Sequence, residues 1–192
     1  WKGLFVKRCI DILGSLVGLV FMVIAMIFVA PAIMIESPGP IFFKQKRVGK
    51  NGRYFEIYKL RSMYMDAEER KKELMAQNEM SGLMFKMKDD PRITKVGKFI
   101  RKTSIDELPQ FFNVLIGNMS IVGPRPHMLY HTEHYSKLIN EYMVRHLCKP
   151  GITGLAQVSG FRGEAKELWQ MKDRVRLDIW YIENWSVWLD LS

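Results

Sequence analysis

Residues 12–35 read ILGSLVGLVFMVIAMIFVAPAIMI, a run of 24 residues without a charged side chain. As one helix, with a rise of about 1.5 Å per residue, this run would extend about 36 Å and exceed the roughly 30 Å of hydrocarbon in a bilayer. Signal peptides have a shorter apolar region that leads into a small-residue cleavage site. The run therefore predicts a helix that inserts into a membrane.

Basic residues flank this apolar run on both sides: Lys7 and Arg8 precede it, and Lys44, Lys46, Arg47 and Lys50 follow it. Positive charges favour the cytoplasmic side of a membrane, so both ends are expected there and the helix should be re-entrant. Pro31 could break the helix where the chain turns back, because proline lacks a backbone N–H. Pro31 lies near the far end of the run, however, so a simple span stays open as the alternative. Asp11 is expected to pair with Arg8 near the headgroups.

Composition bounds the rest of the chain. The 192 residues are 48% hydrophobic, which is enough for a core, and they carry a net charge of +9. We predict a membrane-inserted helix over residues 1–36 and a cytosolic, membrane-associated domain over residues 37–192. The charge indicates phosphate-bearing partners, which are nucleotides, nucleic acid or an anionic membrane surface. Cys9 and Cys148 are too few and too far apart for a secreted disulfide scaffold, which favours a reducing compartment.

A basic β-hairpin is predicted directly after the membrane segment. Residues 41–45 have strand character, and residues 50–53 contain the Asn-Gly pair typical of tight hairpin turns. In the second strand, Lys59 and Arg61 are two residues apart, so their side chains project from the same face. That face would suit a phosphate group, and a solvated or headgroup-contacting face is the alternative.

Three later stretches have helical patterns, which makes the expected fold class α+β. Residues 66–79 begin with a capping aspartate and continue with alternating charges, as in a solvated helix. Residues 95–102 separate three lysines from apolar residues, which fits an amphipathic helix at the membrane interface. From residue 168 onward, an apolar helical stripe is predicted over Leu168, Met171, Val175, Ile179 and Ile182. The tail resembles an interfacial aromatic belt or a core cluster, formed by Trp180, Tyr181, Trp185 and Trp188.

Two patterns could bind a transition metal, but simpler interpretations are preferred. Asp89 and Asp90 before Pro91 are typical of a turn, with a metal-binding acid pair as the minor alternative. The histidines of HMLYHTEH, residues 127–134, lack the His-Glu-x-x-His order of zinc enzymes, so a solvent or interface helix is favoured over a zinc site. The methionine-rich residues 80–87 have no clear period and predict either a loop near lipid or core.

The sequence SIDELPQFFNVLIGN, residues 104–118, contains two adjacent acids, Asp106 and Glu107. Ser104 and Glu107 form a capping-box pattern, so the acids could simply start a helix that covers residues 109–116 and ends at Gly117. Neighbouring side chains on a helix point about 100° apart, so the two carboxylates can act together only if both contact the same bound group. A divalent cation fits this role, and oxygen ligands completed by water and phosphate are typical of Mg²⁺.

Four basic residues are candidates for binding phosphate: Lys59, Arg61, Arg101 and Arg125. Arg125 lies between two prolines that restrict its backbone, which lowers the entropy lost when its guanidinium binds an anion. A structural turn in which Arg125 pairs with Asp106 or Glu107 is the alternative. A carboxylate that attacks phosphorus needs cations to screen the phosphate charge. Asp106 could then act as a nucleophile while Glu107 holds the metal.

Five motifs are distributed along the chain: KRCIDILGS (7–15), SPGPIFFKQKRVGKNG (37–52), YKLRSM (58–63), SIDELPQFFNVLIGNMSIVGPRP (104–126) and KPGITGLAQVSG (149–160). Together they resemble the bacterial sugar transferases, the monotopic phosphoglycosyl transferases that begin glycan assembly on polyprenyl phosphate. HMLYHTEHYSKLINEYMVRH (127–146) and VRLDIWYIENWSVWLD (175–190) are similar to the undecaprenyl-phosphate glucose phosphotransferase branch. Leu155 and Ser159 stand where many relatives have an aromatic residue and an asparagine, which leaves the sugar open.

The resemblance implies that Asp106 attacks the β-phosphate of a UDP-sugar, with glucose favoured and galactose possible, and releases UMP. Undecaprenyl phosphate would then take the sugar phosphate from Asp106, as the first step of exopolysaccharide, capsule or O-antigen assembly. The resemblance also implies Mg²⁺ held by Glu107 with Asp106, and active-site roles for Lys59, Arg101 and Arg125. The expected location is the bacterial inner membrane, with a re-entrant helix and the catalytic domain on the cytoplasmic face.

Two other classes of protein compete with an enzyme. A basic nucleic-acid binder should interleave aromatic residues with arginines in its soluble part, whereas the tryptophans of this chain cluster at the tail beside acids. We therefore expect no nucleic-acid partner. A non-catalytic membrane-surface scaffold would tolerate loss of Asp106 and Glu107. Membrane lipid is an expected partner in every case, and a homo-oligomer is possible.

Overall fold

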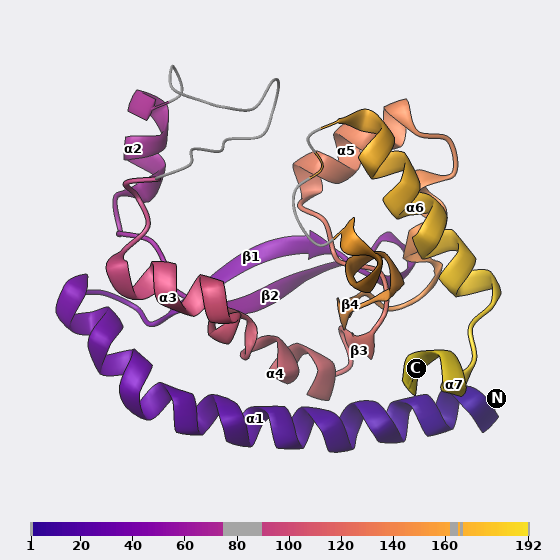
Figure 1. The fold of residues 1–192 in the computed structure, drawn as a ribbon, viewed down its shortest axis with the longest axis horizontal. Helices are drawn as coiled ribbons and strands as arrows, with labels where there is room; N and C mark the ends of the chain where they lie inside the picture. Colours follow the sequence, from indigo (N-terminus) through magenta and orange to yellow (C-terminus); the bar gives the residue numbers. More distant parts are fainter. Residues whose placement is uncertain (1, 75–89, 162–164, 166, 192) are drawn as a thin grey trace. The chain divides into compact units, whose positions relative to one another are not determined.

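The computed structural model describes residues 2–74, 90–161, 165 and 167–191 (Figure 1). The helices are α1 (Lys2–Glu36), α2 (Ala67–Leu74), α3 (Lys95–Thr103), α4 (Gln110–Leu115), α5 (Leu129–Leu138), α6 (Leu168–Glu183) and α7 (Val187–Leu191). Short helical turns are η1 (Lys50–Gly52), η3 (Ile105–Glu107), η4 (Tyr142–Leu147) and η5 (Gln157–Phe161), and the strands are β1 (Phe42–Val48), β2 (Tyr54–Leu60), β3 (Ser120–Val122) and β4 (Gly151–Thr153). Mixed helix and sheet confirm the α+β class. Residues 80–87, predicted as a loop near lipid or as core, and Asp89 lie outside the described residues.

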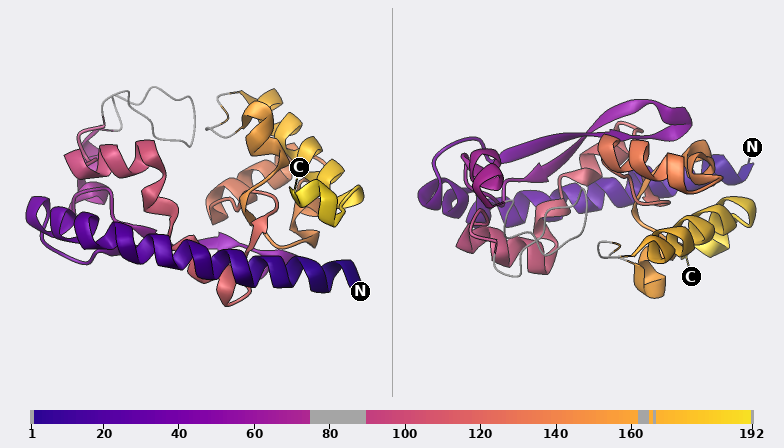
Figure 2. Two further views of the ribbon diagram at one scale, coloured as in Figure 1. Left: turned by 60° about the horizontal axis from the view of Figure 1, so that its bottom comes forward. Right: turned by 90° about the horizontal axis from the view of Figure 1, so that it is seen from above.

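α1 is a single helix that continues through Pro31. The expected break at Pro31 is not observed, because a proline removes one backbone hydrogen bond while bonds further along still form, as from Ser37 N to Ile33 O at 3.0 Å. By length and composition α1 could cross a membrane, and large apolar side chains along it are exposed, including Phe28 and Ile35. Figure 2 shows the same helix from two further sides. The apolar helix is confirmed, whereas its re-entrant insertion stays a prediction.

The chain divides into two compact units, each built from separate stretches of sequence. The first unit consists of Trp1–Leu19, Lys44–Tyr58 and Gln110–Ser192, and the second of Val20–Phe43 and Lys59–Pro109. The helix α1 and the strands β1 and β2 contribute residues to both units. The boundary predicted after residue 36 separates a membrane-inserted part from a cytosolic part, and it stays a prediction.

The β-hairpin forms where the Asn-Gly pair predicts it. β1 and β2 make a two-stranded sheet, and Asn51 (φ 57°) and Gly52 (φ 73°) adopt left-handed conformations between them. Positive φ at both central residues matches the twist of hairpin strands and suits asparagine and glycine. The first strand covers Phe42–Val48 and is therefore longer than the predicted residues 41–45.

The core of the first unit lies between the hairpin and the sheet of β3 and β4. These two strands are parallel, with Ser120 opposite Gly151 and Val122 opposite Thr153. The core residues next to them are apolar and buried: Phe55, Ile57, Val114 and Met119. Gly117 follows α4 and has a φ of 92°. This is the left-handed conformation that was predicted for the glycine at the end of this helix.

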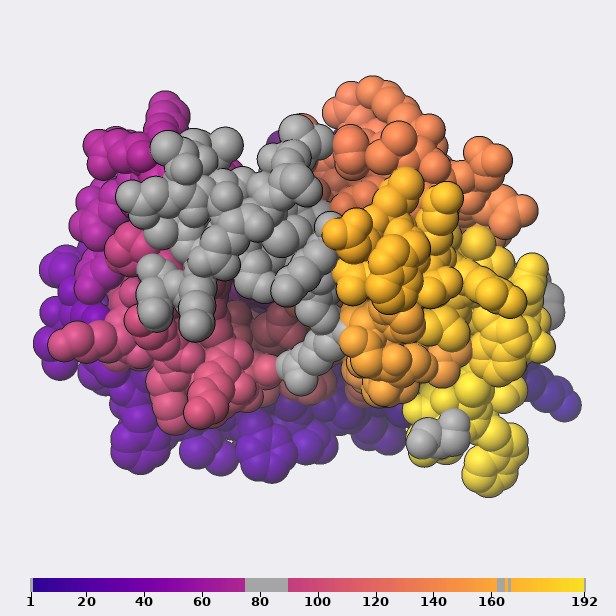
Figure 3. Space-filling view, turned by 45° about the horizontal axis from the view of Figure 1, so that its top comes forward, coloured from indigo at the N-terminus to yellow at the C-terminus, as the bar shows by residue number. Residues whose placement is uncertain are grey.

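α6 buries part of the predicted apolar stripe together with charged residues that the prediction did not include. Figure 3 shows α6 with α5 in the orange and yellow part of the surface. Met171 and Val175 are buried as predicted, but Leu168 is 38% exposed. The buried face also contains Arg174 and Asp178, and Asp178 is neutralised by an ion pair with Arg145 of η4. Local apolar periodicity therefore missed the charged half of this face.

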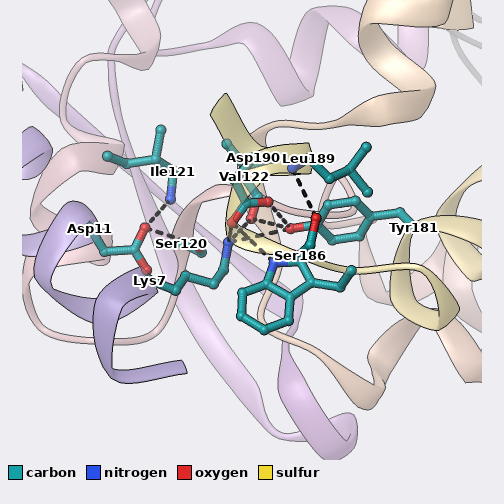
Figure 4. Close-up of polar contacts among 10 residues, drawn as sticks. Lys7, Asp11, Ser120, Ile121, Val122, Tyr181, Ser186, Leu189 and Asp190 are labelled. Atoms are coloured by element: carbon teal, nitrogen blue, oxygen red, sulfur yellow. Dashed lines mark hydrogen bonds and ion pairs between the residues drawn. The ribbon is translucent and has the colours of Figure 1, made fainter. Parts of the chain in front are cut away.

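Polar side chains bind the first turns of α1 to the first unit. Asp11 is buried, and its Oδ1 accepts hydrogen bonds from Ser120 Oγ and Ile121 N, each at 2.9 Å (Figure 4). Arg8 donates to the last carbonyls of α4, at 2.7 Å to Val114 O and 2.7 Å to Leu115 O. The predicted pairing of Asp11 with Arg8 is therefore wrong, because each side chain satisfies backbone groups of a distant segment.

The C-terminal helix α7 is bound to the same end of α1. Lys7 Nζ lies 2.5 Å from Asp190 Oδ2, and Tyr181 Oη donates to Asp190 Oδ1 at 2.6 Å (Figure 4). Trp185 Nε1 also donates to Asp190, at 3.1 Å. Tyr181 and Trp185 thus form part of a polar cluster, whereas Trp188 is 81% exposed. The four aromatic residues of the tail do not share one environment.

Candidate active site

The two adjacent acids lie in η3, directly after α3. Ser104 ends α3 in a left-handed conformation (φ 59°, ψ 17°), and its N–H donates to Arg101 O at 3.3 Å. A capping box needs an extended residue at the start of a helix, and Ser104 does not have that conformation. The capping-box prediction is therefore wrong. The Glu107 side chain binds Lys59 instead of a backbone N–H at the helix start.

Asp106 and Glu107 share their surroundings with Lys59, the penultimate residue of β2. Lys59 Nζ lies 2.8 Å from Glu107 Oε1, and both side chains are largely buried. Asp106 itself is 7% exposed. Burial raises the pKa of Asp106, which Lys59 and Arg101 oppose and the Glu107 carboxylate reinforces. A buried carboxylate between cations and a second acid is an arrangement typical of catalytic sites.

Arg101 reaches this site from the last turn of α3. Its Nε donates at 2.9 Å to Oγ of Ser62, a residue that lies just after the end of β2. Gly97 permits this approach, because a Cβ at this position would lie 1.9 Å from Ser62 O. Thr94 caps the helix by accepting a hydrogen bond from Gly97 N at 2.8 Å. Close contact between α3 and the end of β2 therefore brings Arg101 and Lys59 to the same acids.

Arg61, predicted beside Lys59, lies after the end of β2 with its side chain buried. Its Nε donates to Pro40 O at 2.7 Å, its Nη1 donates to Ser37 Oγ at 2.7 Å, and its Nη2 donates to the Ser37 carbonyl. Desolvation lowers the pKa of Arg61. These bonds hold the turn that follows α1, and a substrate-binding role for Arg61 stays a prediction.

Arg125 belongs to the first unit, where it is half-buried between the buried residues Pro124 and Pro126. The Pro-Arg-Pro loop is held through its carbonyls. Gly151 N donates to Pro124 O at 2.9 Å, and Arg145 Nη2 donates to Arg125 O at 2.8 Å. Because the two prolines have no N–H to donate, carbonyl groups contribute much of the hydrogen bonding that fixes the loop.

A cation at the acids would be bound by oxygen. Asp106 and Glu107 supply two carboxylates, and the described part of the chain has no group of three or more His, Cys, Asp and Glu side chains that could hold a metal. Two oxygen donors fit Mg²⁺, which commonly takes its other ligands from water and substrate phosphates. The residues of the site therefore fit the predicted ion.

In the two other patterns that could bind a metal, His127 and Asp90 contact protein side chains. His127 precedes α5, so the histidines four residues apart do not lie on one helix. Its Nδ1 contacts Tyr142 Oη at 2.5 Å. Asp90 accepts from Arg92, with 2.6 Å between Oδ2 and Nη2, as expected for the turn interpretation.

Glu36 was not predicted to fix the start of α3, the helix that carries Arg101. Its carboxylate caps α3 by accepting hydrogen bonds from Lys95 N at 2.7 Å and Val96 N at 2.9 Å. Desolvation would raise the pKa of Glu36, but these backbone N–H groups, the Lys95 charge and the Tyr64 hydroxyl together outweigh it, and the pKa is lowered. The available signal is its position as the first acid after the apolar run.

Asn113 is a second residue that sequence reasoning missed. It is fully buried in α4, where Nδ2 donates to Glu56 O at 2.7 Å and Oδ1 accepts from Tyr58 N at 3.0 Å. The amide thus continues the hydrogen bonding of β2 as a neighbouring strand would. A single polar residue within the apolar stretch FFNVL was the available signal.

Comparison with known proteins identifies relatives over the whole chain. The family model described as "Bacterial sugar transferase" matches residues 2–192. The chain is 52% identical over 192 residues to "Galactosyl transferase CpsE" of Streptococcus agalactiae serotype III (strain NEM316), covering 100% of this chain and 41% of that protein. It is 48% identical over 186 residues to "UDP-glucose:undecaprenyl-phosphate glucose-1-phosphate transferase" of Klebsiella pneumoniae, covering 97% of this chain and 38% of that protein.

A third relative is similar in length to this chain. The "Exopolysaccharide production protein PSS" of Rhizobium leguminosarum bv. phaseoli is 41% identical over 191 residues, which cover 98% of this chain and 90% of that protein. The chain thus spans about two fifths of the first two relatives, at 41% and 38%, and most of the third.

Proposed function

Because the chain belongs to the bacterial sugar transferase family, we propose that it moves a hexose 1-phosphate from a UDP-sugar to undecaprenyl phosphate. The observation that carries this proposal is the placement of Asp106 and Glu107 beside Lys59 and Arg101. Glucose is the favoured sugar and galactose the alternative, since the relatives are named as a glucose-1-phosphate transferase and a galactosyl transferase. The reaction would begin assembly of an exopolysaccharide, capsule or O-antigen.

In the proposed first step, a carboxylate oxygen of Asp106 attacks the β-phosphorus of the UDP-sugar. The bond between this phosphorus and the bridging oxygen breaks, UMP leaves with that oxygen, and the sugar phosphate stays on Asp106. Burial raises the pKa of Asp106, and a more basic carboxylate is a stronger nucleophile. Lys59 and Arg101 reduce the repulsion between the carboxylate and the phosphate.

Glu107, together with Asp106, is the proposed ligand set for Mg²⁺. A bound Mg²⁺ would neutralise phosphate charge in this site. Lys59 holds Glu107 at 2.8 Å and thereby orients its carboxylate next to the nucleophile. Arg125 and Arg61 are proposed to bind the diphosphate as well. For Arg125, the rigid Pro-Arg-Pro loop supports this role.

In the second step, a phosphate oxygen of undecaprenyl phosphate attacks the same phosphorus. The bond to Asp106 breaks, the carboxylate is regenerated, and undecaprenyl diphosphate sugar is released. An acceptor with a long hydrocarbon chain requires an active site at a membrane surface, and the apolar helix α1 fits membrane association. The exposed lysines of α3, with Phe99 57% exposed beside them, are suited to contact with lipid headgroups.

We propose that α1 is re-entrant and that both its ends lie on the cytoplasmic face of the inner membrane. Its first turns contact β3 and α7 through Lys7 and Asp11, and its last residue, Glu36, caps α3. Basic residues also flank the apolar run on both sides, and positive charges favour the cytoplasmic side of a membrane for each end.

A non-catalytic scaffold is the main alternative to an enzyme, and Asp106→Asn separates the two. The amide keeps the shape of the side chain but is a poor nucleophile. We expect the variant to insert into membranes normally and to release no UMP from UDP-glucose. Lys137→Ala, on α5 with its side chain 72% exposed, serves as a control that should retain turnover.

A second measurement tests the covalent intermediate directly. UDP-glucose labelled in its β-phosphate is incubated with the protein without undecaprenyl phosphate, and bound label is measured after denaturation. Label should stay on the wild-type protein and be absent from Asp106→Asn. Turnover by Asp106→Asn at the wild-type rate would refute the nucleophile assignment. A panel of UDP-sugars in the same assay identifies the sugar.

A further inference from the structure

Arg145 connects helix α6 to the loop that carries Arg125. Its side chain is 1% exposed, and its Nη2 lies 2.7 Å from Oδ2 of Asp178, which is 3% exposed. The same nitrogen donates to Arg125 O at 2.8 Å. One guanidinium nitrogen thus contacts both a buried carboxylate of α6 and the central peptide of the Pro-Arg-Pro loop.

The other terminal nitrogen of Arg145 reaches the far side of Pro126. Nη1 contacts His127 Nδ1, and it lies 3.4 Å from Tyr142 Oη. Desolvation, reinforced by the charge of Arg145, lowers the pKa of His127 well below its ordinary value. The neutral ring can therefore accept a hydrogen bond at Nδ1. Arg145 consequently holds the chain at residues 125 and 127, on either side of one proline.

We infer that Arg145, held by Asp178, is a positioning residue that sets the orientation of Arg125 toward the phosphates of the substrate. The inference rests on the proposed function, in which Arg125 binds the diphosphate. The carbonyl of Arg125 belongs to the peptide that fixes its ψ angle, so movement of this oxygen also moves the side chain. Small displacements of binding groups are costly in sites that depend on orientation.

The chemistry of the guanidinium explains why this position needs arginine. Its planar fork presents several N–H donors in fixed directions, so it can serve Asp178, the carbonyl of Arg125 and the His127 ring together. A lysine would keep the charge beside Asp178 but carries one nitrogen on a flexible stem. Arg145→Lys should therefore preserve the buried ion pair with Asp178 but lose the simultaneous contacts with Arg125 O and His127 Nδ1.

Hydrogen exchange of the full chain in lipid nanodiscs tests whether Arg145 fixes the loop. In Arg145→Lys, we expect the backbone N–H groups of Arg125 and His127 to exchange roughly tenfold faster than in the wild type. The matched control is Arg92→Lys, which changes a buried arginine–aspartate pair in the second unit, where Nη2 lies 2.6 Å from Asp90 Oδ2. This control should leave exchange at the two loop positions unchanged.

Kinetic coupling tests whether the loop position matters for the substrate. If Arg145 acts through Arg125, Arg145→Lys raises the KM for UDP-glucose about tenfold in the wild-type background and has little further effect in Arg125→Ala. A purely structural role would give losses of similar size in both backgrounds. Losses that multiply independently would therefore overturn the inference, as would unchanged exchange at the loop.

A milder variant keeps the test valid if Arg145→Lys does not fold. Tyr142→Phe removes one hydroxyl without changing a charge, and it should accelerate loop exchange less than Arg145→Lys would. Unchanged exchange in Tyr142→Phe would then overturn the inference. The proposed function fails separately: a wild-type protein that releases no UMP refutes it, while the exchange measurement still decides whether Arg145 fixes the loop.

Discussion

Replacing Gly97 by alanine tests how α3 is held against the end of β2. In an exposed helix, alanine is more stabilising than glycine by about 1 kcal/mol. At Gly97, however, the added Cβ would lie 1.9 Å from Ser62 O and 2.8 Å from Thr94 Oγ1. Backbone oxygen cannot rotate away as a side chain can, so either α3 or the segment after β2 must move by more than 1 Å, by about the size of this overlap.

The expected cost of Gly97→Ala follows from the contacts that this movement breaks. The hydrogen bonds from Thr94 N to Ser62 O (3.1 Å) and from Arg101 Nε to Ser62 Oγ (2.9 Å) contribute about 1 kcal/mol each. Looser packing around the fully buried Ile100 costs about another 1–3 kcal/mol. After subtraction of about 1 kcal/mol for helix propensity, the net loss in unfolding free energy is about 2–4 kcal/mol.

Denaturant unfolding in nanodiscs, followed by circular dichroism, measures this loss. Lys98→Ala is the control, because it changes the neighbouring exposed position and should alter stability by about 0.5 kcal/mol or less. UMP release by Gly97→Ala should also fall, since Arg101 is carried by the displaced helix. A Gly97→Ala protein as stable as the wild type would refute the reasoning, because the close contact would then place no constraint on α3.

Three further predictions concern charged groups. Desolvation raises the pKa of Glu36 and the N–H groups of α3 lower it, and the net effect is a decrease. The ionised Glu36 side chain therefore stabilises the fold at pH values above its ordinary pKa of 4.5. This stabilisation is lost as the pH falls through the lower pKa of the folded state. Glu36→Gln should therefore cost about 1 kcal/mol at neutral pH and converge with the wild type in acid, as followed by unfolding at several pH values. Asp11→Ala should lower the unfolding free energy by about 2–4 kcal/mol, because two donors at the start of β3 lose their acceptor; thermal unfolding unchanged from the wild type would contradict this. Burial is the main cause of the raised pKa of Asp106, which Lys59 opposes and Glu107 reinforces. The acid limb of kcat/KM should accordingly move to higher pH in Lys59→Met and to lower pH in Glu107→Gln, and shifts in one direction would argue against Asp106 as the titrating group.

Local patterns predicted the elements of this fold well. The uncharged run predicted α1, the Asn-Gly pair predicted the hairpin turn, and Gly117 predicted the end of the helix α4. Each of these features depends on residues that are neighbours in sequence: an apolar stretch, a turn that needs positive φ, or a helix end. Local rules of this kind do not require knowledge of what a segment packs against.

Partners of polar residues could not be predicted, because they lie far away in sequence. Asp11 binds Ser120, and Arg8 binds the end of α4, more than 100 residues later. The same limitation explains the error in α6, where Asp178 is buried because Arg145 neutralises it. Apolar periodicity assigns charged residues to the surface, so it does not predict a buried ion pair beside an apolar stripe.

The failed capping-box prediction is informative about the candidate site. A capping box stabilises a helix start by about 1 kcal/mol, and Ser104 and Glu107 have the residue types for it. The chain instead places Ser104 in a left-handed conformation and directs Glu107 to Lys59. Local preference is thus overridden at the position where two acids are held together, next to a strand lysine and a helix arginine. Such conflicts between local and tertiary structure are expected at functional sites, which strengthens the case that Asp106 and Glu107 are held for chemistry and not for helix initiation.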